Sequence, residues 1–256
     1  MQRGQLLNAF FASVFSAKAG PWESQALEAR DEAYREDDLP LVEEDCVRDH
    51  LSNLDAHKSM GPDGMHPRVL RELADVIAEP LSIIFERSWR TREVTEDWRK
   101  ASVTPAFKKG KKEHPGNYKL VSLTSISGKV MEQLILKVII KQVEEKKVIR
   151  SSQHGFPKGK SCLTNLTAFC DSMTGWVDEG RAANVVYLDF SKASDTVSHN
   201  ILIGKLRKCG LDEWSVRWIE NWLNGRTQRV VISGAESSWR LVTSGGYTRR
   251  LCCHSE

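Results

Sequence analysis

The feature that most constrains this chain is a short apolar run that ends on an acid, Val185-Val186-Tyr187-Leu188-Asp189. β-Branched and aromatic residues in such a run predict a buried strand, and Asp189 then stands at the carboxyl end of that strand. A second acid, Asp195, follows six positions later. Acids at this edge of a sheet can hold metal ions or act as bases, but a lone acid after a strand is more often the cap of the next helix. A sheet is therefore expected around this strand, and the rest of the chain decides the role of Asp189.

Composition adds only weak constraints on function. The 256 residues are 40% hydrophobic and 28% charged, as in ordinary globular proteins, and the net charge of +3 argues weakly for a polyanionic partner. Charge is unevenly distributed, because residues 108–112 and 137–150 are basic and residues 28–45 are acid-rich. Basic runs of this kind suit a nucleic-acid path, and they suit a solvated loop or helix face equally well.

The cysteines and the apolar runs indicate an intracellular protein. No secretory leader precedes the six cysteines and no CxxC spacing occurs among them, so reduced thiols are expected and a zinc site is not. No run reaches the roughly 18 apolar residues that a membrane span needs. We expect no membrane partner and a location in the nucleus or the cytoplasm, between which the sequence does not choose.

Hydrophobic periodicity predicts helices and strands along most of the chain. Helices are expected at residues 6–17, 47–54, 68–92, 127–147, 200–209 and 213–223, and strands at 101–107, within 118–125, and at 185–188, 228–232 and 239–243. The helix at 68–92 is expected to break near Pro80, and Ser127 is expected to cap the next long helix. Trp214, Trp218 and Trp222 share one helix face, where a core role is more common than base stacking. Residues 21–40 are acidic and bounded by prolines, which suits a linker.

Three loops carry turn chemistry and positive charge. Gly61-Pro62-Asp63-Gly64 is strong turn sequence, because proline fixes one φ angle and glycine permits positive φ and the close approach of another backbone. The lysines at 108–112 connect two expected strands into a hairpin that could close over a phosphate chain. The loop at 153–161 lacks the GxxxxGK[ST] spacing of an ATPase, yet Lys158, Lys160 and the amides of the following helix could hold a phosphate oxygen.

Seven short motifs, each weak alone, occur together in one order. They are Gly61-Pro62-Asp63-Gly64, Gly116-Asn117-Tyr118, Val121-Ser122-Leu123-Thr124-Ser125, Gln153-His154-Gly155-Phe156, Lys158-Gly159-Lys160-Ser161, Tyr187-Leu188-Asp189-Phe190-Ser191-Lys192-Ala193, and Asn221-Trp222-Leu223 with Gly225-Arg226-Thr227-Gln228. In this order and spacing the chain resembles the reverse transcriptases of vertebrate non-LTR retrotransposons, the jockey-like and chicken-repeat type of LINE. The resemblance extends over residues 6–244.

The resemblance implies an α+β fold, a right-hand polymerase with fingers and a palm. Residues 1–50 would form an N-terminal extension and acidic linker, 51–180 the fingers, and 181–245 a partial palm, with 246–256 as an unrelated tail. An RNA template, a DNA primer and a deoxynucleoside triphosphate are the implied partners, and Mg²⁺ is the implied cofactor.

The resemblance also implies roles for individual residues. Asp189 would be the first catalytic carboxylate and a ligand of both magnesium ions, assisted by the carbonyl of Phe190. The implied nucleotide-binding residues are Lys108, Lys109, Lys119 and Ser194. The residues expected to contact nucleic acid are Gly61, Asp63, Gly64, Lys111, Lys112, Lys158 and Lys160.

Several departures from the family pattern weaken the expected site. Lys119 replaces an arginine and offers a point charge instead of a bidentate fork, Leu120 replaces a proline, and Ser194 replaces a phenylalanine that packs under the incoming sugar. After Gly245 the family continues with Val-Pro-Gln-Gly, an apolar helix and a hairpin bearing Ala-Asp-Asp, which residues 246–256 do not resemble. One aspartate cannot hold two magnesium ions that each take about six oxygen ligands. We therefore expect a truncated polymerase that does not synthesise DNA.

A palm sheet without that hairpin would leave Val186, Leu188, Val230 and Ile232 only partly covered, so marginal stability is expected.

Three hypotheses about function remain open. The first hypothesis is an inactive fragment of a reverse transcriptase. The second is a non-catalytic RNA- or DNA-binding module that keeps the loops at 61–64, 108–112 and 158–160. The third is a non-functional chain that unfolds and is degraded, against which soluble expression with a cooperative melt would count.

Overall fold

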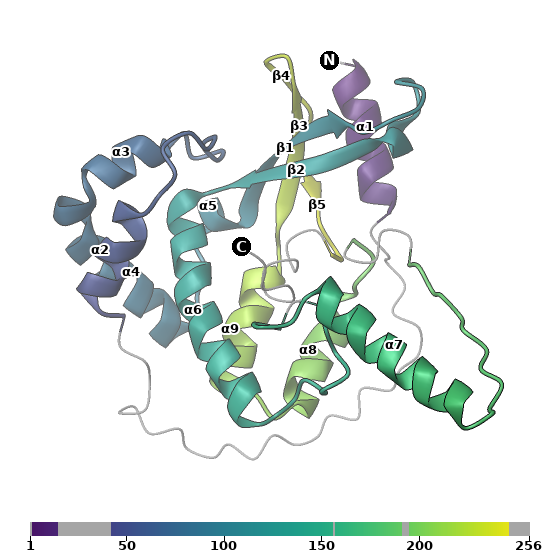
Figure 1. Ribbon diagram of the computed structural model, residues 1–256. Coiled ribbons are helices and arrows are strands. Elements are labelled where there is room, and N and C mark those ends of the chain that lie inside the picture. Colours follow the sequence, from purple (N-terminus) through teal and green to yellow (C-terminus); the bar gives the residue numbers. More distant parts are fainter. Residues whose placement is uncertain (1, 15–41, 156, 191–194, 246–256) are drawn as a thin grey trace.

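A small mixed sheet and a larger group of helices form the molecule (Figure 1). The computed structural model describes residues 2–14, 42–155, 157–190 and 195–245. Within those residues the sheet has five strands, namely β1 (Lys100–Phe107), β2 (Tyr118–Thr124), β3 (Thr227–Ile232), β4 (Ala235–Glu236) and β5 (Arg240–Leu241). The mixture of strands and helices confirms the expected α+β class.

The sheet joins two distant parts of the sequence. Its order is β2-β1-β3-β4, and β5 also pairs with β3. Strands β1 and β2 are antiparallel from the pair Ala101–Thr124 to the pair Phe107–Tyr118, as the predicted hairpin requires. Strand β1 also runs parallel to β3, with Val103 opposite Val230. Strands expected in the fingers and in the palm therefore share one sheet.

Helix α1 (Gln2–Ser13) covers one face of this sheet. Its Leu7 and Phe11 are buried against Val103 of β1 and Val230 of β3, so the helix packs on the sheet. Asn8 adds a polar anchor, because its side-chain amide donates to the hydroxyl of Ser237 at 2.8 Å. The expectation that Val230 would be only partly covered is wrong, since α1 supplies the missing layer.

The main core lies among the other helices. These are α2 (Glu44–Ser52), α3 (Pro67–Glu72), α4 (Ala74–Thr91), α5 (Glu96–Arg99), α6 (Ile126–Glu145), α8 (His199–Lys208) and α9 (Glu213–Leu223). Tryptophan rings hold its centre: Trp218 stacks on Trp222 with ring centroids 4.9 Å apart, and Trp222 lies 6.2 Å from Trp98. Trp218 and Trp222 are buried, so the predicted core role is confirmed for them, while Trp214 packs at the edge.

Two helix boundaries differ from the prediction. The long helix breaks at Leu73, between α3 and α4, and Pro80 lies inside α4. Ala78 and Ser82 are buried on either side of Pro80, and this packing keeps the helix continuous although proline removes one backbone hydrogen bond. Ser125, and not Ser127, caps α6, because its hydroxyl accepts from the amide of Gly128 at 3.3 Å.

The predicted buried strand at residues 185–188 does not form. These residues run extended between α7 (Cys162–Asp178) and α8 without a neighbouring strand among the described residues, and the side chains of Val186, Tyr187 and Leu188 are 77–85% exposed. A strand requires a partner for its backbone N–H and C=O groups, and both edges of β3 are already taken by β1, β4 and β5. Local apolar character is therefore insufficient here, and the expected burial of the strand is wrong.

Three of the expectations concern residues that the structure does not describe. The linker at 21–40, Ser194 and the tail at 246–256 belong to the undescribed part. A short 3₁₀ turn, η2 (Pro115–Asn117), precedes β2. None of the described helices combines the length and the apolar character that crossing a membrane requires.

Candidate functional site

The lysine loop at the tip of the β1–β2 hairpin is held in shape by its own backbone. The Lys108 amide donates to the carbonyl of Asn117 at 2.8 Å, and the Asn117 side-chain amide donates to the Lys111 carbonyl at 2.9 Å. The hydroxyl of Tyr118 donates to the carbonyl of Lys112 at 2.9 Å. These bonds close the loop while Lys108, Lys109, Lys111 and Lys112 stay exposed. The structure thus fixes the backbone and leaves the ammonium groups of Lys108, Lys109 and Lys111 to solvent or to a ligand, while that of Lys112 lies 5.8 Å from the ring centre of Phe107.

Lys119 adds a further charge next to this loop. It follows Tyr118 on β2, and its neighbours Tyr118 and Leu120 pack toward α1, so alternation along the strand turns Lys119 to the opposite face. Among the described residues, Lys108, Lys109, Lys111 and Lys119 form no ion pair. Five predicted lysines are therefore gathered at one end of the hairpin, and four of them have no acidic partner there.

The Gly61–Gly64 turn lies at the other end of the hairpin. The Gly64 amide donates to the Gly61 carbonyl at 3.2 Å, and Gly64 has a φ of 71°, so the predicted turn is confirmed. A Cβ on Gly61 would lie 2.5 Å from the carbonyl oxygen of Thr124, the last residue of β2. Lysine loop and glycine turn are thus separated by the length of β2, roughly 20 Å at the usual rise per strand residue. Asp63 accepts from the amide of Met65 at 3.3 Å and serves the turn itself.

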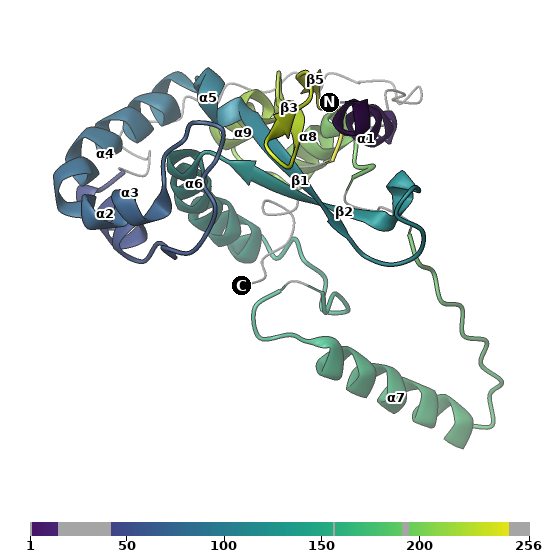
Figure 2. The same ribbon diagram turned by 90° about the horizontal axis from the view of Figure 1, so that it is seen from above.

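Lys158 and Lys160 precede α7, as predicted, but they differ in their environment. Lys158 is exposed, whereas the ammonium of Lys160 donates to the carbonyl of Ser151. Ser161 caps α7 by accepting from the amide of Thr164 at 3.3 Å, so that amide has an internal partner. In Figure 2, α7 stands away from the sheet and from the lysine hairpin. The structure does not bring this loop together with the hairpin.

Asp189 lies on the exposed extended segment, next to Phe190, whose side chain is 76% exposed. Asp195 belongs to a different environment, since its carbonyl accepts from the hydroxyl of Ser244 at 3.0 Å. Among the described residues, no three His, Cys, Asp or Glu side chains are grouped so that they could hold a metal ion. The residues present therefore do not fit the pair of magnesium ions that the resemblance implies, and the catalytic role of Asp189 stays a prediction.

Two arrangements of basic residues were missed by sequence reasoning. Arg229 on β3 lies on the same sheet face as Lys119, with its guanidinium 4.7 Å from the ring centre of Trp239 and an ion pair to Glu236. Lys129 and Lys137 on α6 line a pocket with residues of α2. Their spacing of two helical turns could have shown that they share a face. Arg229 lies on β3 and Trp239 lies in the segment before β5, so nothing local in the sequence links them.

Comparison with known proteins gives a consistent result. The family model described as "Reverse transcriptase (RNA-dependent DNA polymerase)" matches residues 108–247, more than half of the chain. The probable RNA-directed DNA polymerase from transposon BS of Drosophila melanogaster is 27% identical over 170 residues, which cover 66% of this chain and 19% of that protein. The RNA-directed DNA polymerase from mobile element jockey of the same species is 26% identical over 210 residues, 81% of this chain and 23% of that protein.

A third relative is the Retrovirus-related Pol polyprotein from type-1 retrotransposable element R2 of Popillia japonica. It is 24% identical over 159 residues, 62% of this chain and 20% of that protein. The chain thus spans about a fifth of the length of the curated relatives it matches.

Proposed function

The chain belongs to the reverse transcriptase (RNA-dependent DNA polymerase) family, and we propose that it is a nucleic-acid-binding part of a non-LTR retrotransposon polymerase that does not synthesise DNA by itself. The relatives support the first half of this proposal, because two of them are named as RNA-directed DNA polymerases of mobile elements. The motif order supports a jockey-like LINE of the vertebrate, chicken-repeat type. RNA template, DNA primer and nucleoside triphosphate are the proposed partners.

The domain arrangement is part of the proposal. Residues 51–180 would act as fingers and 181–245 as a partial palm, after an N-terminal extension at 1–50 and before an unrelated tail at 246–256. The β1–β2 hairpin with its exposed lysines supports a fingers role, because it presents charge on a backbone that is already ordered. The partial palm would contribute β3, β4 and β5 to the same sheet.

The single observation that carries the binding function is the group of lysines at the hairpin tip. Exposed ammonium groups without acidic partners are available to phosphates, and a closed loop lowers the entropy that binding costs. We propose Lys108, Lys109, Lys119 and Ser194 as nucleotide contacts. Gly61, Asp63, Gly64, Lys111, Lys112, Lys158 and Lys160 are proposed as nucleic-acid contacts.

The proposed lack of catalysis rests on Asp189. Two-metal phosphoryl transfer needs several oxygen ligands around each ion, and a single exposed carboxylate supplies too few. Asp189 and Phe190 are proposed as the positions that correspond to the first metal-binding motif of the family. The described residues do not form a group of ligands that could hold magnesium.

A primer-extension assay tests the lack of catalysis. The purified full chain is incubated with a primed RNA template, nucleoside triphosphates and Mg²⁺ or Mn²⁺, and no extension is expected. Template-dependent incorporation that disappears in Asp189→Asn would overturn this half of the proposal and would show that the carboxylate finds its partners in solution.

A salt titration tests the binding half separately. Affinity for single-stranded RNA should fall with salt, and each phosphate contact contributes about 0.7 to the slope of log K against log salt. The double variant Lys109→Gln/Lys111→Gln should make this negative slope shallower by about 1.4. Lys205→Gln/Lys208→Gln, which removes two exposed lysines of α8, serves as the matched control and should leave it unchanged. Equal slopes for both variants would contradict a role for the hairpin.

A further inference from the structure

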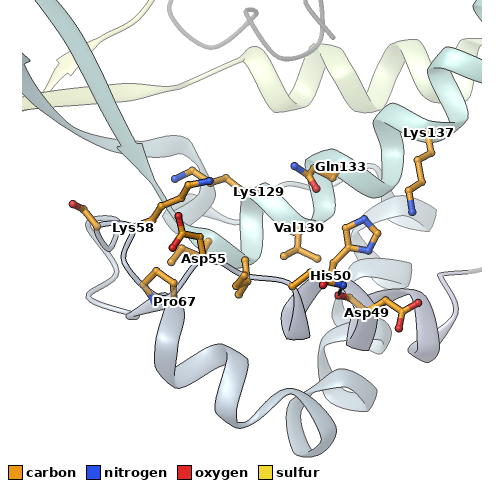
Figure 3. A pocket seen from close by; sticks show the side chains of 13 residues that line it. Asp49, His50, Asp55, Lys58, Pro67, Lys129, Val130, Gln133 and Lys137 are labelled. Atoms are coloured by element: carbon orange, nitrogen blue, oxygen red, sulfur yellow. Dashed lines mark hydrogen bonds between the residues drawn. The ribbon is translucent and has the colours of Figure 1, made fainter. Parts of the chain in front are cut away.

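A pocket between α2 and α6 lies outside the hairpin and outside the extended segment that carries Asp189. It has a volume of about 460 Å³ and is bounded by α2, by the chain that connects α2 to α3, and by the first three turns of α6 (Figure 3). A cavity of this size falls within the range of small-molecule sites. Its floor is apolar, since Val130 and Ile126 are buried and Leu54 and Pro67 complete the lining.

Three lysines enter the pocket from two sides. In Figure 3, Lys58 extends from the connecting chain toward α6, and Lys137 extends from α6 toward His50 on α2. Lys129 stands two turns before Lys137 on the same helix face. Among the described residues, no acid forms an ion pair with Lys58 or Lys137, although Asp49 and Asp55 also line the pocket. The pocket therefore holds positive charge that the protein itself does not neutralise.

His50 offers a polar group of a different kind. Its Nδ1 lies 2.6 Å from the carbonyl oxygen of Cys46, and because a carbonyl can only accept, Nδ1 donates there. Nε2 is then left for a ligand, as an acceptor when the ring is neutral. A ligand hydroxyl could donate to it. The backbone of α2 thus fixes the orientation of the ring, and Nε2 stays available to a ligand in the pocket.

We propose that this pocket binds the phosphate monoester of a nucleotide, with its base on the apolar floor. Lys58 and Lys137 offer ammonium groups to a phosphate, whereas Asp49 and Asp55 oppose ligands with many negative charges. A lining that mixes lysines with aspartates suits one phosphate better than a triphosphate. The apolar part of the lining suits a base, and His50 suits a sugar hydroxyl. The site goes beyond the proposed function, because it lies at the opposite end of β2 from the lysine hairpin.

The test uses the full chain with 5′-AMP as the probe, in EDTA so that metal-dependent binding of the nucleotide elsewhere is suppressed. Titration calorimetry should show saturable binding of 5′-AMP and at least tenfold weaker binding of adenosine. The double variant Lys58→Gln/Lys137→Gln should weaken 5′-AMP binding at least tenfold. Lys141→Gln, one turn farther along α6 and outside the pocket, is the matched control and should bind as the unaltered chain does.

Two further measurements keep the test decisive. The His50 ring signals in an NMR spectrum should shift on addition of 5′-AMP, which localises the ligand even if a variant folds poorly. A 5′-phosphorylated oligonucleotide that competes with 5′-AMP, while its 5′-hydroxyl counterpart does not, identifies a strand end as the source of the phosphate; absence of competition identifies a free nucleotide. No binding of 5′-AMP, or binding that the Lys58 and Lys137 changes leave intact, overturns the proposal whether or not the hairpin binds RNA.

Discussion

Gly61 is a residue at which the structure leaves no room for a side chain. A Cβ at this position would meet the carbonyl oxygen of Thr124 at 2.5 Å and its carbonyl carbon at 2.6 Å. Both are backbone atoms at the end of β2, so relief requires movement of the strand or the turn. Gly61→Ala should therefore lower the free energy of unfolding by about 1–3 kcal/mol, as overpacking does elsewhere. Urea denaturation of the variant and of the unaltered chain measures this difference in the free energy of unfolding.

A control for this substitution comes from another glycine. Gly204 lies inside α8, and a Cβ there would meet nothing within 4 Å. Gly204→Ala should be neutral or stabilising, because alanine favours the helix by about 1 kcal/mol. Equal losses of stability in both variants would show that the contact between the turn and β2 does not form in solution.

His199 makes stability depend on pH in a definite direction. Burial lowers the pKa of His199 below its usual value. The hydrogen bond to the Gly245 carbonyl, 3.5 Å from Nε2, offsets part of this effect, and the charge of Arg226 lowers the pKa a little further. The unfolded chain then binds a proton more readily than the folded one below about pH 6.5. The stability contributed by neutral His199 is full above that pH and is lost as the pH falls through and below it.

The corresponding measurement compares the unaltered chain with His199→Gln. Glutamine can still donate to the Gly245 carbonyl but does not titrate. Between pH 7.5 and pH 5.5 the unaltered chain should lose more stability than the variant, because carboxylates contribute the same background to both. A steeper loss in the variant would mean that the pKa of His199 is raised in the folded state.

For single residues, the sequence predicted the structural features that have a local cause and did not predict those that depend on distant parts of the chain. The turn at Gly61 and Gly64 could be read directly, because proline and glycine dictate backbone angles wherever they occur. The cap of α6 was misplaced by two residues, since Ser125 and Ser127 are both suitable and only the final position of β2 selects the first. The environment of Asp189 could not be read, because it depends on strands far away in the sequence.

Helix α7 is the element whose apolar residues have no partner in the described structure. None of its residues is buried, and Leu163, Leu166 and Val177 are 57–68% exposed. Leu166→Ala should therefore change the free energy of unfolding by less than about 0.5 kcal/mol, as substitutions at exposed positions usually do. Leu70→Ala, which removes a side chain that is 2% exposed, is the contrasting variant and should cost about 2–5 kcal/mol. A large cost at Leu166 would reveal that α7 packs against a surface in solution.

The elements also show which patterns in the sequence predict structure. The β1–β2 hairpin, α6 and α9 were predicted because their period and their turns agree with their final surroundings. The strand at 185–188 was not, because a pattern of apolar residues specifies a face to be buried but not the neighbour that buries it. Lys129 and Lys137 of the pocket between α2 and α6 share a helix face, which the sequence shows, but the α2 wall opposite them could not be predicted from the sequence.

The whole molecule depends on contacts across the boundary that the motifs place at residues 180 and 181. The core that contains Phe85, Trp89 and Trp98 is completed by Trp218 and Trp222 of α9. Hydrogen bonds cross the same boundary: the indole of Trp214 donates to the carbonyl of Trp89 at 2.9 Å. The guanidinium of the buried Arg226 donates to the carbonyl of Trp98 at 3.1 Å. Fingers and partial palm are therefore expected to fold as one cooperative unit.

A chain ending at residue 180 tests this expectation. It keeps β1, β2 and most helices but lacks the two tryptophans that fill the core, so large apolar surfaces on α4 and α6 would face water. We expect it to show helical far-UV circular dichroism without a cooperative melt or a structured near-UV spectrum, whereas the full chain shows both. Adding residues 181–256 as a separate chain should restore part of the near-UV signal. A cooperative melt of the shorter chain alone would mean that the fingers are an independent domain and that α9 only covers a core already formed.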